Sequence, residues 1–223
     1  MNRPMSLHQT LTWSRAFSEA MTSYFELNTI RKLQLGSGTN VLAGWFNTDV
    51  TPRDNVYFLD SSKPFPFKDA VFHYIFSEHH IEHLTYNHGL FTLRECYRVL
   101  LPGGKIRIAT PSLEMLLNLY TASPDEFQQR YIHFILDNFL PRIQNANPVF
   151  IINNAFRNWG HQFLYDRVTL QQAMEDVGFV DISHTVPGES DDEQLYALEK
   201  HGVFIEDEEM NRFETQVLEG RRP

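Results

Sequence analysis

The sequence predicts an α/β protein whose central sheet is mostly parallel and covered on both faces. Two observations lead to this class: short apolar runs end in glycine or polar residues, and stretches of helical periodicity separate them. Strands that alternate with helices are typical of βαβ units, and hence of a parallel sheet. The chain has 223 residues, 42% of them hydrophobic, which suffices for a large core without disulfides or metals. We therefore expect a single domain over residues 1–223.

The first half of the chain predicts one helix and four strands. Apolar residues at helical spacing predict a helix over residues 7–28. The strands are expected at residues 32–35, 45–50, 56–59 and 70–76, each ending in polar residues or glycine. Because the interval between Gly38 and Asp49 is short, the first crossover should be a shortened helix or a loop.

The second half predicts three further strands and an inserted segment. We expect a helix over residues 87–100 capped by Asn87 and stopped at Pro102-Gly103-Gly104, and another helix capped by Asp166. The strands are expected at residues 105–109, 180–184 and 213–218. Residues 112–158 look helical but irregular and are too long for a plain connection. They predict a helical insertion beside the site, or else one that only contributes packing.

Charge and cysteine content limit the partners. The net charge is −9, from 19 Lys and Arg against 28 Asp and Glu, and such a chain lacks the basic clusters that nucleic acids require. The single cysteine, Cys96, cannot form an intrachain disulfide. The N-terminal residues lack the apolar run of a signal peptide, and no stretch is long enough to span a membrane. We expect a cytoplasmic protein with no nucleic acid or membrane partner, and no oligomeric state is predicted.

The residues after the first two strands suggest a ligand site. The bend Gly36-Ser37-Gly38 would let a ligand approach the backbone and would offer N–H donors. Val41 stands where a dinucleotide fingerprint needs its third glycine, and no Gly-Lys-Ser/Thr follows, so a pyrophosphate ligand is disfavoured. Asp49, at the end of the second strand, could accept hydrogen bonds from both hydroxyls of a ribose, or could simply form a turn.

Three motifs in chain order resemble those of the class I S-adenosylmethionine-dependent methyltransferases. The first is Leu33-Gln34-Leu35-Gly36-Ser37-Gly38, after the first strand. Asp60 and the run over residues 64–72 resemble the third-strand acid and the LPF-x-D-x-x-F-D segment, and residues 94–104 resemble the ExxRVLxPGG turn. The subgroup that the chain most resembles is the bacterial small-molecule methyltransferases.

The resemblance implies a Rossmann-like, doubly wound, mostly parallel sheet of seven strands, with the helical insertion after strand five. It also implies S-adenosyl-L-methionine as cofactor. The backbone at Gly36, Ser37 and Gly38 would hold its methionine end, Asp49 its ribose, and Asp60 with Ser61 its adenine. The remaining cofactor contacts implied are Leu35, Val50, Ser77 and Glu78.

The most concentrated titratable residues follow the fourth strand, in Ser77-Glu78-His79-His80-Ile81-Glu82-His83. His79, Glu82 and His83 match the H-x-x-E-H zinc pattern of one metalloprotease group. They also resemble the E-x-x-E-H run with which small-RNA 2′-O-methyltransferases bind a divalent cation, and His161 would be the fourth ligand. In the interpretation that we favour, no metal is assigned, His79 faces the substrate, and Glu82 and His83 have supporting roles.

The sequence thus predicts methyl transfer to an oxygen or nitrogen of a small-molecule acceptor. His161 and His79 are the candidate catalytic residues, because a histidine can take a proton from an attacking hydroxyl or amine near neutral pH. One alternative is a non-catalytic binding protein with the same fold. Another is a metal-dependent enzyme that uses the His79, Glu82 and His83 cluster.

Overall fold

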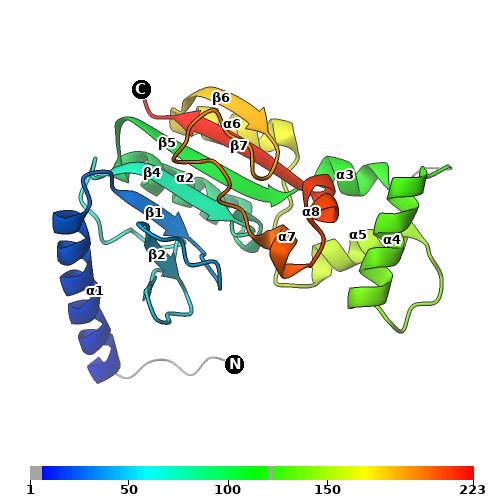
Figure 1. The fold of residues 1–223 in the computed structure, drawn as a ribbon, viewed down its shortest axis with the longest axis horizontal. Helices are drawn as coiled ribbons and strands as arrows, with labels where there is room; N and C mark the ends of the chain where they lie inside the picture. Colours follow the sequence, from blue (N-terminus) through cyan, green and yellow to red (C-terminus); the bar gives the residue numbers. More distant parts are fainter. Residues whose placement is uncertain (1–6, 121–122) are drawn as a thin grey trace.

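A seven-stranded sheet organises the structure, a computed structural model that describes residues 7–120 and 123–223. The strand order is β3-β2-β1-β4-β5-β7-β6 (Figure 1). The strands are β1 (Lys32–Leu35), β2 (Phe46–Asp49), β3 (Val56–Phe58), β4 (Phe72–Glu78), β5 (Leu100–Pro111), β6 (Val180–Thr185) and β7 (Thr215–Arg221). Strands β1 to β5 are parallel, whereas β7 runs antiparallel to both of its neighbours. The predicted Rossmann-like, mostly parallel sheet is confirmed.

Three helices cover one face of this sheet: α1 (Leu7–Leu27), α2 (Tyr86–Val99) and α6 (Arg167–Val177). The α6 prediction is confirmed, since Asp166 accepts the Thr169 N–H and Gly178, at φ 112°, ends the helix. The predicted ends of α2 are wrong. Its N-cap is Thr85, which accepts the His88 N–H, and the helix stops at Val99 because Leu100 already pairs with Phe72 in the sheet. The Pro102-Gly103-Gly104 turn therefore lies within β5.

Alternating side chains of β5 separate the two faces of the sheet. Ile106 and Ile108 join the large core beneath α2 and α6, together with aromatic residues from α1 such as Phe17 and Phe25. Lys105 and Arg107 point to the opposite face, where they meet acidic residues that come from far along the chain. Hydrophobic and charged residues therefore alternate along β5 because one face of the strand meets the core and the other meets acidic side chains.

An irregular segment, residues 186–200, covers that opposite face and is called the strap here. The loop over residues 36–45 joins β1 to β2 without a helix, as the short spacing predicts, and the strap packs where a crossover helix is missing. Leu195 and Leu198 of the strap pack with Trp45 and Phe76. The cover on the second face is therefore mainly a non-helical segment, whereas the sequence pattern suggested helices.

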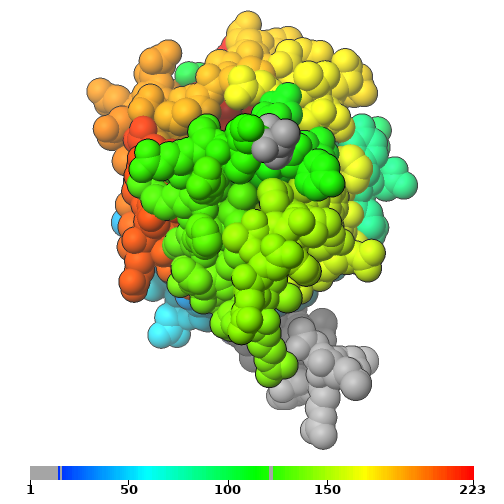
Figure 2. Space-filling model, turned by 90° about the vertical axis from the view of Figure 1, so that its right-hand side faces the viewer, coloured from blue at the N-terminus to red at the C-terminus, as the bar shows by residue number. Residues whose placement is uncertain are grey.

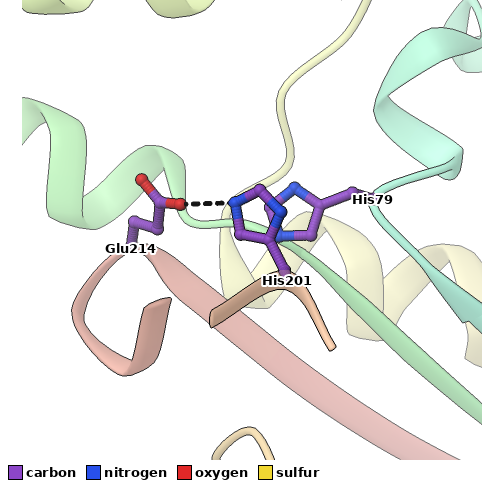
Figure 3. A group of neighbouring side chains, drawn as sticks. All are labelled: His79, His201 and Glu214. Carbon is purple, nitrogen blue, oxygen red and sulfur yellow. Dashed lines mark hydrogen bonds and ion pairs between the residues drawn. The ribbon is translucent and has the colours of Figure 1, made fainter. Parts of the chain in front are cut away.

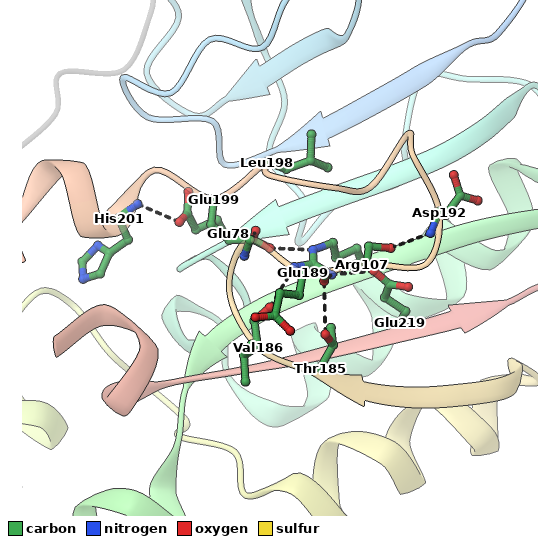
Figure 4. A network of polar contacts seen from close by, with 12 residues as sticks. Glu78, Arg107, Thr185, Val186, Glu189, Asp192, Leu198, Glu199, His201 and Glu219 are labelled. Atoms are coloured by element: carbon green, nitrogen blue, oxygen red, sulfur yellow. Dashed lines mark hydrogen bonds and ion pairs between the residues drawn. The ribbon is translucent and has the colours of Figure 1, made fainter. Parts of the chain in front are cut away.

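The fully buried Arg107 fastens the strap (Figure 4). Its guanidinium donates to Glu199 Oε1 at 2.6 Å and to Glu219 Oε1 of β7 at 2.5 Å, and to the backbone carbonyl of Glu189 at 2.8 Å. Lys105 Nζ adds an ion pair with Asp192 at 2.9 Å. This network brings residues 198–201 to the carboxyl end of β4.

The helical insertion after β5 consists of three helices: α3 (Leu113–Asn118), α4 (Glu126–Phe139) and α5 (Pro148–Arg157). Side chains of Ser112, Asp125 and Asn147 cap their N-termini. The insertion has a core of its own, shared with α8 (Glu208–Glu214), and it lies with α7 (His201–Phe204) beyond the carboxyl ends of the parallel strands (Figure 1). Figure 2 looks onto the insertion, drawn in green.

The described helices are too short or too polar to cross a bilayer.

Candidate active site

The bend after β1 is shaped for a ligand that lies against its backbone. Gly36 and Gly38 have φ values of 60° and 52°, which favour glycine. A Cβ on Gly36 would lie 2.4 Å from Cδ2 of His80, so the imidazole itself requires a glycine there. A Cβ on Gly38 would meet no described atom within 4 Å. The backbone at Gly38 therefore borders open space at the carboxyl edge of the sheet.

Two carboxylates flank this bend. Asp49, the last residue of β2, accepts the Gly38 N–H at 2.9 Å through Oδ2 and the Thr51 N–H at 2.7 Å through Oδ1. Asp60, after β3, accepts the Ser62 N–H at 3.0 Å and the Ser62 hydroxyl at 2.6 Å, both on Oδ1. An ionised carboxylate has about four acceptor positions, so each retains capacity for a ligand.

His80 fills the space beneath the bend. Its ring packs on Gly36 and its Nε2 lies 2.9 Å from the hydroxyl of the buried Ser61. Burial lowers the pKa of His80 to about 4, so the imidazole is neutral at pH 7. The neutral imidazole therefore packs against the backbone of the bend and supports it from inside the protein.

The remaining predicted cofactor contacts differ in which of their atoms could touch a ligand. Leu35 is in the core, so only its backbone can face a ligand, whereas Val50 is 62% exposed just beyond Asp49. Ser77 is buried at the end of β4. The Glu78 carboxylate accepts the backbone N–H groups of Lys200 and His201 at 2.8–3.0 Å, so it anchors the strap to the edge.

These residues fit an adenosyl ligand with an amino-acid tail. Such a ligand needs carboxylates for its ribose hydroxyls and its amino groups, and backbone N–H donors for its own carboxylate. Asp49, Asp60 and the glycine bend supply these groups at adjoining strand ends. The buried hydroxyl of Ser37 has no hydrogen-bond partner among the described residues.

A cavity of about 220 Å³ lies beside the edge, between the end of β5, the insertion, α7 and α8. Its polar lining residues are His79, His83, Asn154, His161, His201 and Glu214. The other lining residues are aliphatic or aromatic, among them Tyr131, Phe134 and Trp159, and the described lining contains no lysine or arginine. The cavity suits an apolar molecule without negative charge.

His79 reaches this cavity from the loop after β4, and each of its ring nitrogens lies near a polar side chain. Its Nε2 lies 3.2 Å from Thr215 Oγ1, whose hydroxyl donates to Asn211, and its Nδ1 lies 3.4 Å from Glu82 Oε1. Burial alone would lower the pKa of His79, but Glu82 outweighs it and raises that pKa. The same pairing lowers the pKa of the buried Glu82 to about 2 against the opposing effect of burial. Glu82 is therefore ionised at neutral pH, and it favours the protonated form of His79.

His201 stacks on His79 with ring centroids 3.8 Å apart (Figure 3). Its Nε2 lies 2.9 Å from Glu214 Oε1, and the Tyr131 hydroxyl donates to the other Glu214 oxygen at 2.6 Å. Burial would raise the pKa of Glu214, yet the hydrogen bond with His201 lowers it. The sequence did not single out His201 or Glu214, because nothing in their local pattern indicates that the strap returns to β4.

His161 lines the cavity and has one ring nitrogen without a hydrogen-bond partner among the described residues. Its Nδ1 lies 2.7 Å from the carbonyl of Ala155 in α5, and a carbonyl can only accept, so the proton is on Nδ1. The Nε2 atom then carries a lone pair. Burial lowers the pKa of His161, which keeps this form at neutral pH. His161 therefore has the protonation state of a proton acceptor.

Two groups in the described chain could hold a metal ion: His79, His201 and Glu214, and Glu82, His83 and His161. In each group one ligand atom per residue lies within 4.8 Å of the others. Imidazole lone pairs lie in the ring plane, so the stacked rings of His79 and His201 cannot both face one ion without rotating. The rings of His83 and His161 are inclined by 74°, with centroids 5.0 Å apart, which permits convergence. The sequence placed His79 in one candidate metal cluster with Glu82 and His83. In the structure, the candidate metal cluster that contains His79 also contains His201 and Glu214.

Comparisons with known proteins agree with this geometry. Residues 47–108 match the family model described as a methyltransferase domain. The matched segment comprises 62 of the 223 residues, and it is similar to a methyltransferase domain. S-adenosylmethionine is accordingly the cofactor of the chain, and methyl transfer is its reaction. No curated protein matches the sequence.

A solved structure shows the same fold at low identity. A methyltransferase from Thermotoga maritima aligns with a TM-score of 0.52 at 14% identity, over 97% of this chain and 96% of that chain. At this identity the likeness concerns the fold alone. A methyltransferase from Archaeoglobus fulgidus aligns with a TM-score of 0.49 at 17% identity, over 95% of this chain and 93% of that chain.

Proposed function

We propose that the methyltransferase acts on an oxygen or nitrogen nucleophile of a small molecule held in the cavity beneath the insertion, as in the bacterial small-molecule subgroup. The observation that carries this proposal is the mostly apolar cavity of about 220 Å³ that shares His79 with the carboxyl edge of the sheet. A cavity of this size excludes a polymer from its interior. It accommodates a molecule of roughly the size of a substituted aromatic ring.

Each predicted cofactor residue has a task in this scheme. The Gly36–Gly38 bend would hold the methionine end, Asp49 with Val50 the ribose, and Asp60 with Ser61 the adenine. Leu35 and Ser77 would contribute through their backbone, and Glu78 would act by holding the strap against the edge. When bound, the cofactor supplies a methyl group on a positively charged sulfur, which leaves as a neutral thioether when the methyl is transferred.

The protein's remaining tasks are to align the acceptor and to remove its proton. His161 Nε2 would take the proton of the attacking hydroxyl or amine, because this nitrogen carries a lone pair and the residue lines the cavity. His79 is less suited to that role, since both of its nitrogens are already engaged. We assign His79 a structural role in the cavity wall, where its ion pair with Glu82 fixes the position of the imidazole.

Turnover with methyl-labelled S-adenosylmethionine and a panel of small phenols and amines tests the function. We expect label transfer to at least one acceptor and a kcat loss of about 10²- to 10⁴-fold in His161→Ala, with cofactor affinity unchanged. His133→Ala, which removes an exposed imidazole of α4, is the matched control. Cofactor binding without transfer to any acceptor would favour the non-catalytic alternative, and an unchanged kcat in His161→Ala would remove that histidine from the mechanism.

A second candidate is a cation-dependent reaction. The observation that favours it is Glu82 Oε1, a buried oxygen that has an ion pair with His79 at 3.4 Å but no hydrogen bond among the described residues, beside His83 and His161. Elemental analysis of the purified protein, and turnover after chelation, test it. Stoichiometric metal that Glu82→Gln abolishes would support the candidate, and full activity of metal-free protein would exclude it.

A further inference from the structure

A tryptophan at the cavity combines exposure with a strained backbone. Trp159, which follows α5, is 49% exposed and lines the cavity. Its φ is 56°, in the left-handed region that bulky side chains rarely adopt. Tryptophan side chains are, on average, largely buried in proteins. The stability of the fold therefore does not explain an exposed indole on an unfavourable backbone.

The strain belongs to a tight turn that joins α5 to the proposed base. The His161 N–H donates to the Asn158 carbonyl at 3.2 Å, and the two residues between them, Trp159 and Gly160, both have positive φ. Such a turn favours asparagine, aspartate or glycine at its first central position, where this chain has tryptophan. Backbone strain of this kind is found chiefly at active sites and ligand clamps. The turn thus places an indole at the cavity at a cost in stability.

The indole lies among other rings of the cavity wall. It meets Phe139, the last residue of α4, at a centroid distance of 5.3 Å and an interplanar angle of 88°, and the ring of His161 at 5.6 Å. Phe139 is 37% exposed and lines the same cavity. Because the contact with Phe139 is perpendicular, it leaves much of the indole uncovered. Trp159 and Phe139 therefore offer accessible ring surface close to the proposed base.

We propose that Trp159 determines the acceptor class: its indole binds an aromatic ring of the acceptor, whose nucleophile lies toward His161. An aromatic ring against the indole gains an edge-to-face or offset-stacked contact in addition to the area that it buries. A saturated ring of the same size gains the buried area alone. This inference rests on the proposed function for the role of the ligand as methyl acceptor, but the preference for an aromatic ring is a binding property of the cavity.

Binding of two matched alcohols tests it without turnover. The probes, 2-phenylethanol and 2-cyclohexylethanol, carry the same hydroxyl on the same linker and differ in whether the ring is aromatic. Their dissociation constants are measured by ligand-observed NMR on the full chain with S-adenosylhomocysteine. We expect 2-phenylethanol to bind about three- to tenfold more tightly, as one aromatic pair allows. If burial alone decided, the more hydrophobic cyclohexyl ring would bind more tightly.

The indole signal of Trp159 shows whether the contact is direct. The sequence has three tryptophans, so the Nε1–H resonance of Trp159 is identified by its loss in Trp159→Leu. This resonance should shift when 2-phenylethanol is added, whereas that of the buried Trp45 should not.

Variants assign the preference to the indole. Trp159→Leu should bind 2-phenylethanol about three- to tenfold more weakly and lose the preference, and Trp159→Phe should keep part of it. Trp159→Asn, which suits a left-handed backbone, should lose the preference while the turn is retained. Phe156→Leu changes an exposed aromatic residue of α5 that does not line the cavity, and it should behave as the wild type. Thermal unfolding verifies that each variant is folded.

The outcomes separate this inference from the function. Equal binding of the two probes to the wild type, a preference that survives in Trp159→Leu, an unshifted Trp159 resonance, or binding of neither probe would overturn the inference. If the preference is present and depends on Trp159 but no methyl transfer is found, the inference stands and the proposed function fails. Methyl transfer to aliphatic acceptors alone would keep the function and overturn the inference.

Discussion

Acidification should weaken the fold through His80, the imidazole beneath the glycine bend. Burial lowers the pKa of His80 from 6.5 to about 4, so the unfolded chain binds a proton between these values that the folded protein does not. Stability therefore rises with pH across this window and falls as the pH drops from 6.5 to 4. The shift corresponds to about 3 kcal/mol, or about 1.4 kcal/mol per pH unit within the window.

Urea unfolding of the wild type and His80→Gln at several pH values between 4 and 7 measures this contribution. Other groups titrate in both proteins, so the difference in slope isolates His80. The variant should be less stable at pH 7, because the contacts with Gly36 and Ser61 change, but its stability should fall less steeply with acid. His133→Gln, at an exposed site, should follow the wild-type slope. Parallel curves for wild type and His80→Gln would refute the buried neutral imidazole.

Three further predictions concern the edge, the strap and a helix end. Asp49→Ala should raise the dissociation constant of S-adenosylmethionine by about 10- to 100-fold in calorimetry, through loss of charge-assisted hydrogen bonds, and an unchanged constant would remove Asp49 from the cofactor site. Arg107→Met should destabilise the protein by about 3–5 kcal/mol in urea, because Glu199 and Glu219 lose their cation, and a loss below 1 kcal/mol would show that the strap is held otherwise. Gly178→Ala should cost about 1–2 kcal/mol in thermal unfolding, since its φ is 112° and a Cβ would lie 3.2 Å from Tyr97, whereas equal stability would contradict the left-handed cap.

Local pattern was sufficient for the sheet. Strand β1 was predicted with the bounds that it has, and the short interval before Asp49 predicted a shortened helix or a loop at the first crossover, of which the structure has the loop. Errors arose where tertiary pairing overrode local signals. The Pro102-Gly103-Gly104 turn resembles a helix stop, but pairing of Leu100 with Phe72 begins the strand before it.

The residues expected at the cofactor edge could be named from the sequence because they follow strands directly, and their contacts with the cofactor stay a prediction. The cavity could not be predicted in this way, because its walls come from distant segments. His201 and Glu214 reach it only because the buried Arg107 and Glu199 fix the strap, and a lone arginine in a strand gives no sign of such a partner.

The most direct test of the account is a structure of the protein with S-adenosylhomocysteine bound. The account predicts the ribose at Asp49, the adenine at Asp60, and the sulfur directed at the cavity that His161 lines. A ligand bound elsewhere, or a sulfur separated from that cavity by the side chains of the protein, would contradict it.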